Sequence, residues 1–154
     1  MPSEDVIELL GVWEGYRVGS VKRSLSEVGK PAAITIDLLR KADDPMFCSG
    51  CGQTCDRYHD WEERWVRDLP ILDARTHLLL PRFRVDCGRC GPTVELLAWL
   101  DKYARVTKRL AESVARLCRV LPVKHVAEFY GLGWDAVKAI DKAYLETTLG
   151  EPDL

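Results

Sequence analysis

The chain has 154 residues, of which 47% are hydrophobic and 30% charged, so its composition is that of a globular protein and excludes an intrinsically disordered one. No apolar run is long enough to span a membrane, and the acidic N-terminal segment lacks the basic and apolar regions of a signal peptide. We therefore expect a cytoplasmic protein without a membrane partner. The formal net charge of -2 provides no general attraction for nucleic acid.

Residues 1–45 are predicted to form a small β arm. The segments Tyr16–Lys22 and Ala33–Leu39 are rich in strand-forming residues, and a polar loop containing Gly29 separates them. We expect them to pair as a hairpin that lies against the next part of the chain. Before this hairpin, Val6–Leu10 is predicted to begin a short helix.

Two motifs of the same form follow, CSGCG at residues 48–52 and CGRCG at residues 87–91. A cytoplasmic protein keeps its thiols reduced, so two CxxC pairs indicate a zinc site rather than a disulfide framework. Zn²⁺ prefers four soft ligands in a tetrahedron, and each motif supplies two thiolates. The glycine after each second cysteine permits a turn with positive φ that aims backbone N–H groups at the sulfurs. The predicted ligands of one structural zinc ion per chain are Cys48, Cys51, Cys87 and Cys90.

The distance between the two motifs predicts an elongated ribbon. Thirty-five residues separate Cys51 from Cys87, whereas a compact zinc ribbon has about 15–20. Within this gap, Glu62–Leu69 and Arg75–Cys87 are rich in strand formers and are separated by turn-forming residues. We therefore expect a hairpin that leaves one motif and returns into the other, so that residues 46–92 form a zinc ribbon with long strands.

Other uses of these cysteines remain open. A thioredoxin-like CxxC pair would begin a helix in a βαβ unit, and neither pair has that setting. A catalytic zinc ion needs an open coordination position, whereas four thiolates close the site. Cys55 or His59 could replace one of the four ligands, and Cys118 lies in an apolar helical stretch where a core position is expected.

After a linker at residues 93–104, the residues from 105 to 150 are predicted to be helical. Apolar residues recur every three or four positions, which indicates a first helix that begins after Thr107 and ends at Pro122. A second helix is expected at about residues 123–130 and a third from Trp134. Residues with the size and polarity that a helix-turn-helix needs occupy the matching positions, namely Val126, Ala127, Tyr130, Gly131, Leu132, Val137 and Ile140. A helical bundle without a DNA role is the alternative.

The charge distribution supports a DNA-binding role for this part of the chain. Residues 101–145 carry nine basic and five acidic side chains, an excess of positive charge in an otherwise acidic chain. The third helix is expected to enter the major groove, where Lys138 could donate to guanine or to a phosphate. Trp134 could instead be a packing residue. The predicted DNA-contacting residues are Lys108, Arg109, Lys124, Trp134, Lys138 and Lys142.

The motifs occur in a fixed order: CSGCG, WVRDLP, RFRVDCGRCGPTVE and the helical stretch at residues 105–146. Over about residues 10–150 this arrangement resembles the front part of bacterial insertion-sequence transposases of the ISL-three family. The resemblance implies a zinc-binding domain with the four CxxC cysteines as ligands and a helix-turn-helix at residues 123–142 that recognises terminal inverted repeats. It also implies a large RNase H-like catalytic domain of the DDE type, for which the 154 residues leave no room.

The sequence therefore predicts an α+β fold, with a small β hairpin arm and a long-stranded zinc ribbon followed by a helical helix-turn-helix module. The expected function is DNA binding by a truncated transposase that has no catalytic activity of its own, with residues 151–154 as a truncated linker. Double-stranded DNA is the expected partner, together with a homo-oligomer or full-length transposase, and the expected location is the bacterial nucleoid. The alternatives are a zinc-stabilised protein-interaction module, which the net charge favours, and a small transcription regulator.

Overall fold

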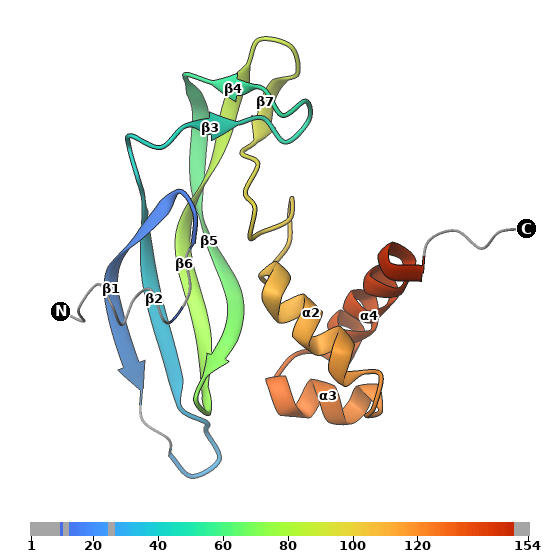
Figure 1. Ribbon diagram of the computed structural model, residues 1–154. Coiled ribbons are helices and arrows are strands. Elements are labelled where there is room, and N and C mark those ends of the chain that lie inside the picture. The colour runs from blue at the N-terminus through green and yellow to red at the C-terminus, as the bar shows by residue number, and fades with distance from the viewer. Residues whose placement is uncertain (1–9, 11–12, 25–26, 150–154) are drawn as a thin grey trace, which may run out of the picture.

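A computed structural model describes residues 10, 13–24 and 27–149. The short helix expected from Val6 and the linker expected at residues 151–154 lie outside the described residues, apart from Leu10. The described part combines β-sheets with three C-terminal helices, which confirms the predicted α+β class. Figure 1 shows the sheet along one side of the molecule and the helices beside it.

Two sheets contain all the strands of the described residues. The larger has the order β1-β2-β6-β5, with β7 pairing to β6, and every pair in it is antiparallel except β2–β6. The smaller consists of β3 and β4. The strands are β1 (Tyr16–Ser24), β2 (Ala33–Arg40), β3 (Met46–Phe47), β4 (Thr54–Cys55), β5 (Tyr58–Ile71), β6 (Ala74–Cys87) and β7 (Gly91–Val94).

The four strand predictions are confirmed, and each of these strands extends at least one residue beyond its expected bounds, whereas β3, β4 and β7 were not predicted. β1 and β2 form the predicted hairpin, while β5 and β6 form the long hairpin between the CxxC motifs. β2 also pairs in parallel with β6, so the hairpin arm and the ribbon share one continuous sheet. β3, β4 and β7 gather at one end of the β5–β6 hairpin, and the helices lie beside β5 (Figure 1).

One face of this sheet is buried because side chains alternate along each strand. Buried and half-buried residues alternate from Ala74 to Leu80, so every second side chain of β6 enters the core. The residues that form this core are Trp13, Tyr16, Ile36, Leu38, Val66, Leu78, Leu80, Leu97 and Leu100. The opposite side, called the open face below, carries the partly or fully exposed side chains of Thr35, Trp65, Arg67, Arg75 and His77.

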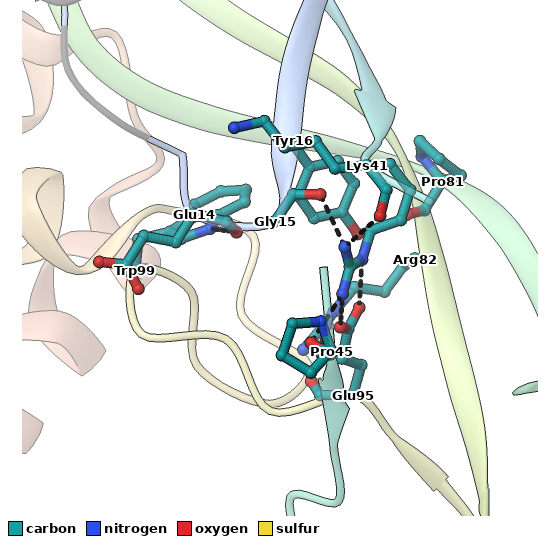
Figure 2. Close-up of polar contacts among 10 residues, drawn as sticks. Glu14, Gly15, Tyr16, Lys41, Pro45, Pro81, Arg82, Glu95 and Trp99 are labelled. Atoms are coloured by element: carbon teal, nitrogen blue, oxygen red, sulfur yellow. Dashed lines mark hydrogen bonds and ion pairs between the residues drawn. The ribbon is translucent and has the colours of Figure 1, made fainter. Parts of the chain in front are cut away.

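A buried ion pair joins the end of β2 to the segment after β7. Arg40 Nη2 lies 2.5 Å from Glu95 Oε2, and both side chains are almost fully buried. Arg40 also donates to three backbone carbonyls, including that of Pro45, and Arg82 donates to the backbone carbonyl of Glu95 (Figure 2). These contacts satisfy two charges that would otherwise be costly to bury. They fix the start of the chain that leads from the ribbon to the helices.

The helices are α2 (Lys108–Leu117), α3 (Val123–Tyr130) and α4 (Trp134–Leu149). Thr107 is the predicted N-cap of α2, and its hydroxyl accepts from the backbone N–H of Leu110. The prediction that this first helix reaches Pro122 is wrong, because it ends at Leu117. A proline disfavours helical φ and ψ at the residue before it, and residues 118–121 form tight turns instead. In the described residues, none of the helices combines the length and apolarity needed to cross a membrane.

The three helices pack on a second core of their own, formed by Leu110, Val114, Val126, Ala127, Tyr130 and Val137. α3 ends at Gly131, which adopts a left-handed conformation with φ of 65°. This is the short turn with positive φ that the helix-turn-helix prediction required.

Candidate metal centre and nucleic-acid interface

The structure brings the four CxxC cysteines together at the ribbon end of the sheet. The sulfurs of Cys48, Cys51, Cys87 and Cys90 all lie within 4.8 Å of one another. Cys51 Sγ and Cys87 Sγ are 3.6 Å apart, and a tetrahedral zinc ion with Zn–S bonds of about 2.3 Å would separate its sulfurs by about 3.8 Å. The donor set and its spacing therefore fit Zn²⁺.

The two motifs reach this geometry by the same local turn. Gly52 and Gly91 each have φ of 75°, as the sequence predicted for the glycine after the second cysteine. The backbone N–H group of Gly50 donates to Cys48 Sγ at 3.3 Å. The backbone N–H group of Cys90 donates to Cys87 Sγ at 3.4 Å. These bonds orient both sulfurs and stabilise their thiolate forms.

The electrostatics of the cluster call for a cation. Burial opposes the ionisation of Cys48, but the backbone N–H groups of Cys51 and Gly50 outweigh it and lower the pKa of Cys48 to about 6. The backbone N–H group of Cys90 likewise lowers the pKa of Cys87. The pKa of Cys90 rises to about 12, because its thiol hydrogen bonds to Cys51 and Cys48. Four thiolates at this spacing repel one another, and a bound dication would remove that penalty.

The other candidate ligands lie apart from the four-sulfur group. Cys55 is buried beside the group, but its thiol donates to the carbonyl of Gln53 at 3.7 Å, and burial raises its pKa. His59 is exposed on β5, and Cys118 is the half-buried C-cap of α2. Within the described residues, neither Cys55 nor His59 belongs to the group of possible ligand atoms.

The predicted DNA-reading residues of α4 share one exposed face. Val137 is fully buried against the helical core, whereas Trp134, Lys138 and Lys142, spaced by four residues, point away from it. The Lys138 ammonium lies 4.9 Å from the centre of the half-exposed Trp134 ring. Trp134 therefore lies beside Lys138 on this face rather than in the core.

The two acidic residues of α4 have different surroundings. Asp141 forms an ion pair with Arg119, which follows α2, and so points sideways rather than outward. Asp135 is exposed in the first turn of α4, where the positive end of the helix dipole favours a carboxylate. Lys142 has a weak partner, the Glu146 carboxylate, at 4.0 Å.

The remaining predicted contacts fall into two groups. Lys108 and Lys124 are exposed in the first turns of α2 and α3, and Lys108 lies 3.4 Å from Asp101. Arg109, in contrast, is engaged within the chain: its Nε and Nη2 donate to Asp68 at 2.7 and 2.5 Å, and its Nη1 donates to the carbonyl of Leu10.

Asp68 is a residue that sequence reasoning missed. Its carboxylate is 1% exposed and also accepts from Trp13 Nε1 and Thr107 Oγ1. It therefore joins the sheet to the start of α2. No local pattern marks it, because its partners are far away in the sequence.

Comparison with known proteins gives two family models that match. The model described as the zinc-finger of transposase IS204/IS1001/IS1096/IS1165 matches residues 44–90, and the model described as the helix-turn-helix domain of transposase family ISL3 matches residues 95–145. The transposase for insertion sequence element IS1001 of Bordetella parapertussis is 41% identical over 154 residues, which cover 99% of this chain. The chain spans 37% of the length of that relative. No solved structure matches the chain.

Proposed function

We propose that the chain, which carries the zinc-ribbon and helix-turn-helix domains of the ISL3 transposase family, binds double-stranded DNA through α4. The observation that carries this proposal is the exposed face formed by Trp134, Lys138 and Lys142 on the last helix of the helix-turn-helix. A helix in this position enters the major groove, where a lysine donates to guanine O6 and N7 or to a phosphate.

Two further lysines are proposed to hold the flanking DNA backbone. Lys108 and Lys124 lie in the first turns of α2 and α3, and charge neutralisation of phosphates by such residues makes binding weaken as salt rises. Arg109 is left out of this interface, because its guanidinium is occupied by Asp68 and the carbonyl of Leu10.

The ribbon is proposed to bind one Zn²⁺ through the cysteine sulfurs of the two CxxC motifs. The four sulfurs within 4.8 Å of one another support this assignment. Small β units bury little apolar surface, so a structural metal supplies folding free energy that the ribbon lacks. The metal site is thus proposed to stabilise the fold and to take no part in chemistry.

Because the relative is a transposase for an insertion sequence element, we propose that the DNA target is the terminal inverted repeat of an insertion sequence. DNA cleavage and joining by a DDE-type catalytic domain would then belong to the part of such a transposase outside the 37% matched here. A second copy of the chain or a full-length transposase is the proposed protein partner, and the nucleoid the proposed location.

Fluorescence anisotropy with the zinc-loaded chain tests the proposal. A duplex that carries the terminal inverted repeat of the insertion sequence should bind more tightly than a duplex of scrambled sequence. Both affinities should fall steeply as the salt concentration rises. Lys138→Ala should weaken binding to the inverted-repeat duplex by about 1–3 kcal/mol. The control is Lys41→Ala, which removes an exposed lysine just after β2 and should leave the affinity unchanged.

Equal affinity for the two duplexes would contradict recognition of inverted repeats but not DNA binding. Absence of binding at low salt would contradict DNA binding itself and favour the protein-interaction alternative.

A further inference from the structure

A group of basic side chains on the open face lies against the turn of the helix-turn-helix. Arg67, on β5, donates from Nη2 to the carbonyl of Tyr130 at 2.6 Å and from Nη1 to the carbonyl of Gly131 at 3.0 Å. These are carbonyls at the C-terminal end of α3, where a cation is stabilised by the helix dipole. The sheet therefore fixes the position of the turn that leads into α4.

Arg75, on β6, lies against the same turn with its guanidinium unoccupied. A Cβ atom added to Gly131 would lie 2.1 Å from Arg75 Cζ, so the guanidinium packs directly over this glycine. Across residues 13–24 and 27–149, its side chain has no hydrogen-bond or ion-pair partner, and the residue is only partly buried. Gly131 lies three residues before Trp134, so this free guanidinium is held next to the start of α4.

The basic character continues across the sheet. In the strand register Arg67 is opposite His77, His77 is opposite Thr35, and Thr35 is opposite Lys22, which places these four side chains in one row on the open face. The neighbouring row towards the hairpin end contains Arg75, Ala33 and Ser24. No acidic residue occurs in these two rows of the described sheet.

The open face also carries the acidic residue Asp37, which lies two rows from Arg75 in the strand register. Asp37 lies in the row on the other side of Lys22 and accepts a hydrogen bond from Ser20 at 2.6 Å. The charges of Arg67 and Arg75 also act on each other and, after burial, are the causes that lower the pKa of His77. The protein thus holds two guanidinium groups close together without a carboxylate between them.

We propose that this row is a second DNA contact, in which Arg75 binds a backbone phosphate of the same duplex that α4 reads and Lys22 follows the duplex further across the sheet. The charges of Arg67 and Arg75 repel each other in the free protein, and a phosphate bound by Arg75 reduces that repulsion. The contact extends the footprint beyond the helix-turn-helix onto the β5–β6 hairpin. It carries no base readout, because phosphate contacts position the protein without reporting sequence.

This inference rests on the proposed function, and Arg75→Ala tests it separately. The affinity of the zinc-loaded chain for a random-sequence duplex is measured at several salt concentrations. Removing one phosphate contact should reduce the slope of log affinity against log salt by about one and weaken binding several-fold at low salt. Arg75→Lys should retain the slope.

Arg17→Ala is the control, because it removes an arginine charge from the open face at the far end of β1, away from the helix-turn-helix. It should leave slope and affinity unchanged. Zinc content and melting temperature, measured for every variant, identify any effect that comes from misfolding.

The outcomes separate the two proposals. If the unmodified chain binds no duplex, the proposed function itself fails. If it binds and Lys138→Ala weakens it, while Arg75→Ala keeps the original slope, the second contact is overturned and the α4 contact stands. A loss that Arg17→Ala reproduces would also overturn it.

Discussion

At the residue scale, the buried carboxylate of Asp68 decides how α2 is attached to the sheet. It accepts hydrogen bonds from Trp13, Thr107 and Arg109 and from the backbone N–H group of Leu69. The single pattern that sequence reasoning could use here was the charge of Arg109, which suggested a DNA contact. Within the chain Arg109 pairs with Asp68, 41 residues away, and pairs at such separations leave no local signal. The metal cluster, in contrast, was predictable, because the two cysteines of each CxxC motif lie within four residues of sequence.

Asp68→Asn should destabilise the protein. The substitution removes the charge that pairs with Arg109 and leaves a partly buried guanidinium without its counter-ion, which should cost about 1–3 kcal/mol. Urea unfolding followed by circular dichroism measures the effect. Asp60→Asn, in an exposed ion pair with Arg84, is the control and should change stability little. Equal effects of the two substitutions would show that burial of Asp68 contributes nothing.

The same carboxylate predicts a pH dependence. Burial alone would raise the pKa of Asp68, but the donors from Arg109 and Thr107 outweigh it and hold the pKa below its ordinary value. A lowered folded-state pKa stabilises the fold above the unfolded value of about 3.9, and this stabilisation is lost as the pH falls below it. The melting temperatures of the unmodified chain and Asp68→Asn should therefore differ most near neutral pH and converge as the pH falls through the lowered folded-state pKa of Asp68. A constant difference would contradict the assignment.

At the scale of elements, the turn between α3 and α4 depends on one glycine. The helix-turn-helix pattern predicted Gly131 because that turn needs positive φ, and the structure gives 65°. The pattern did not show that Arg75 on β6 packs over this glycine or that Arg67 on β5 donates to its carbonyl. Nor did it show that α2 ends at Leu117, because the apolar spacing continues through the turns that follow. Local spacing thus predicts helices well but not what packs against their ends.

Gly131→Ala should destabilise the helical module, and Gly133→Ala should not. Left-handed backbone costs a non-glycine residue about 1–2 kcal/mol, and the new Cβ would also displace the Arg75 side chain. Gly133 lacks a positive φ, and nothing lies within 4 Å of a Cβ built there. Chemical unfolding monitored by the helical signal at equal protein concentration compares the two variants. Matching losses of stability would contradict this account of the turn.

At the scale of the whole molecule, metal removal should affect the two ends of the protein differently. The cysteine cluster, the sheet core and the helical core consist of separate sets of buried residues. Cys90→Ser should therefore lose zinc and order in the ribbon end while the helical circular dichroism signal persists. Cys118→Ser, outside the cluster, should keep one zinc per chain by elemental analysis. Loss of the helical signal together with zinc would show instead that the modules fold as one.

The sequence predicted the four long strands and the three described helices, but not the short strands β3, β4 and β7 or how the sheet joins. The arm and the ribbon were expected to lie against each other, whereas β2 and β6 form a parallel pair within one sheet. Alternating apolar residues show which face of a strand is buried, but they do not identify its neighbour. The Arg40–Glu95 ion pair, which ties this sheet to the chain leading to the helices, was hidden for the same reason.

The parallel β2–β6 pair also sets an order of assembly. The β5–β6 hairpin closes through a two-residue turn between Ile71 and Ala74, so it can form early and locally. β2 pairs across a much longer stretch of chain, because the first CxxC motif and the whole of β5 lie between it and β6. Loop closure over that span is entropically costly before the pairing rewards it. We therefore expect folding to proceed from the ribbon hairpin outward, with the N-terminal strands as the last part of the sheet to join.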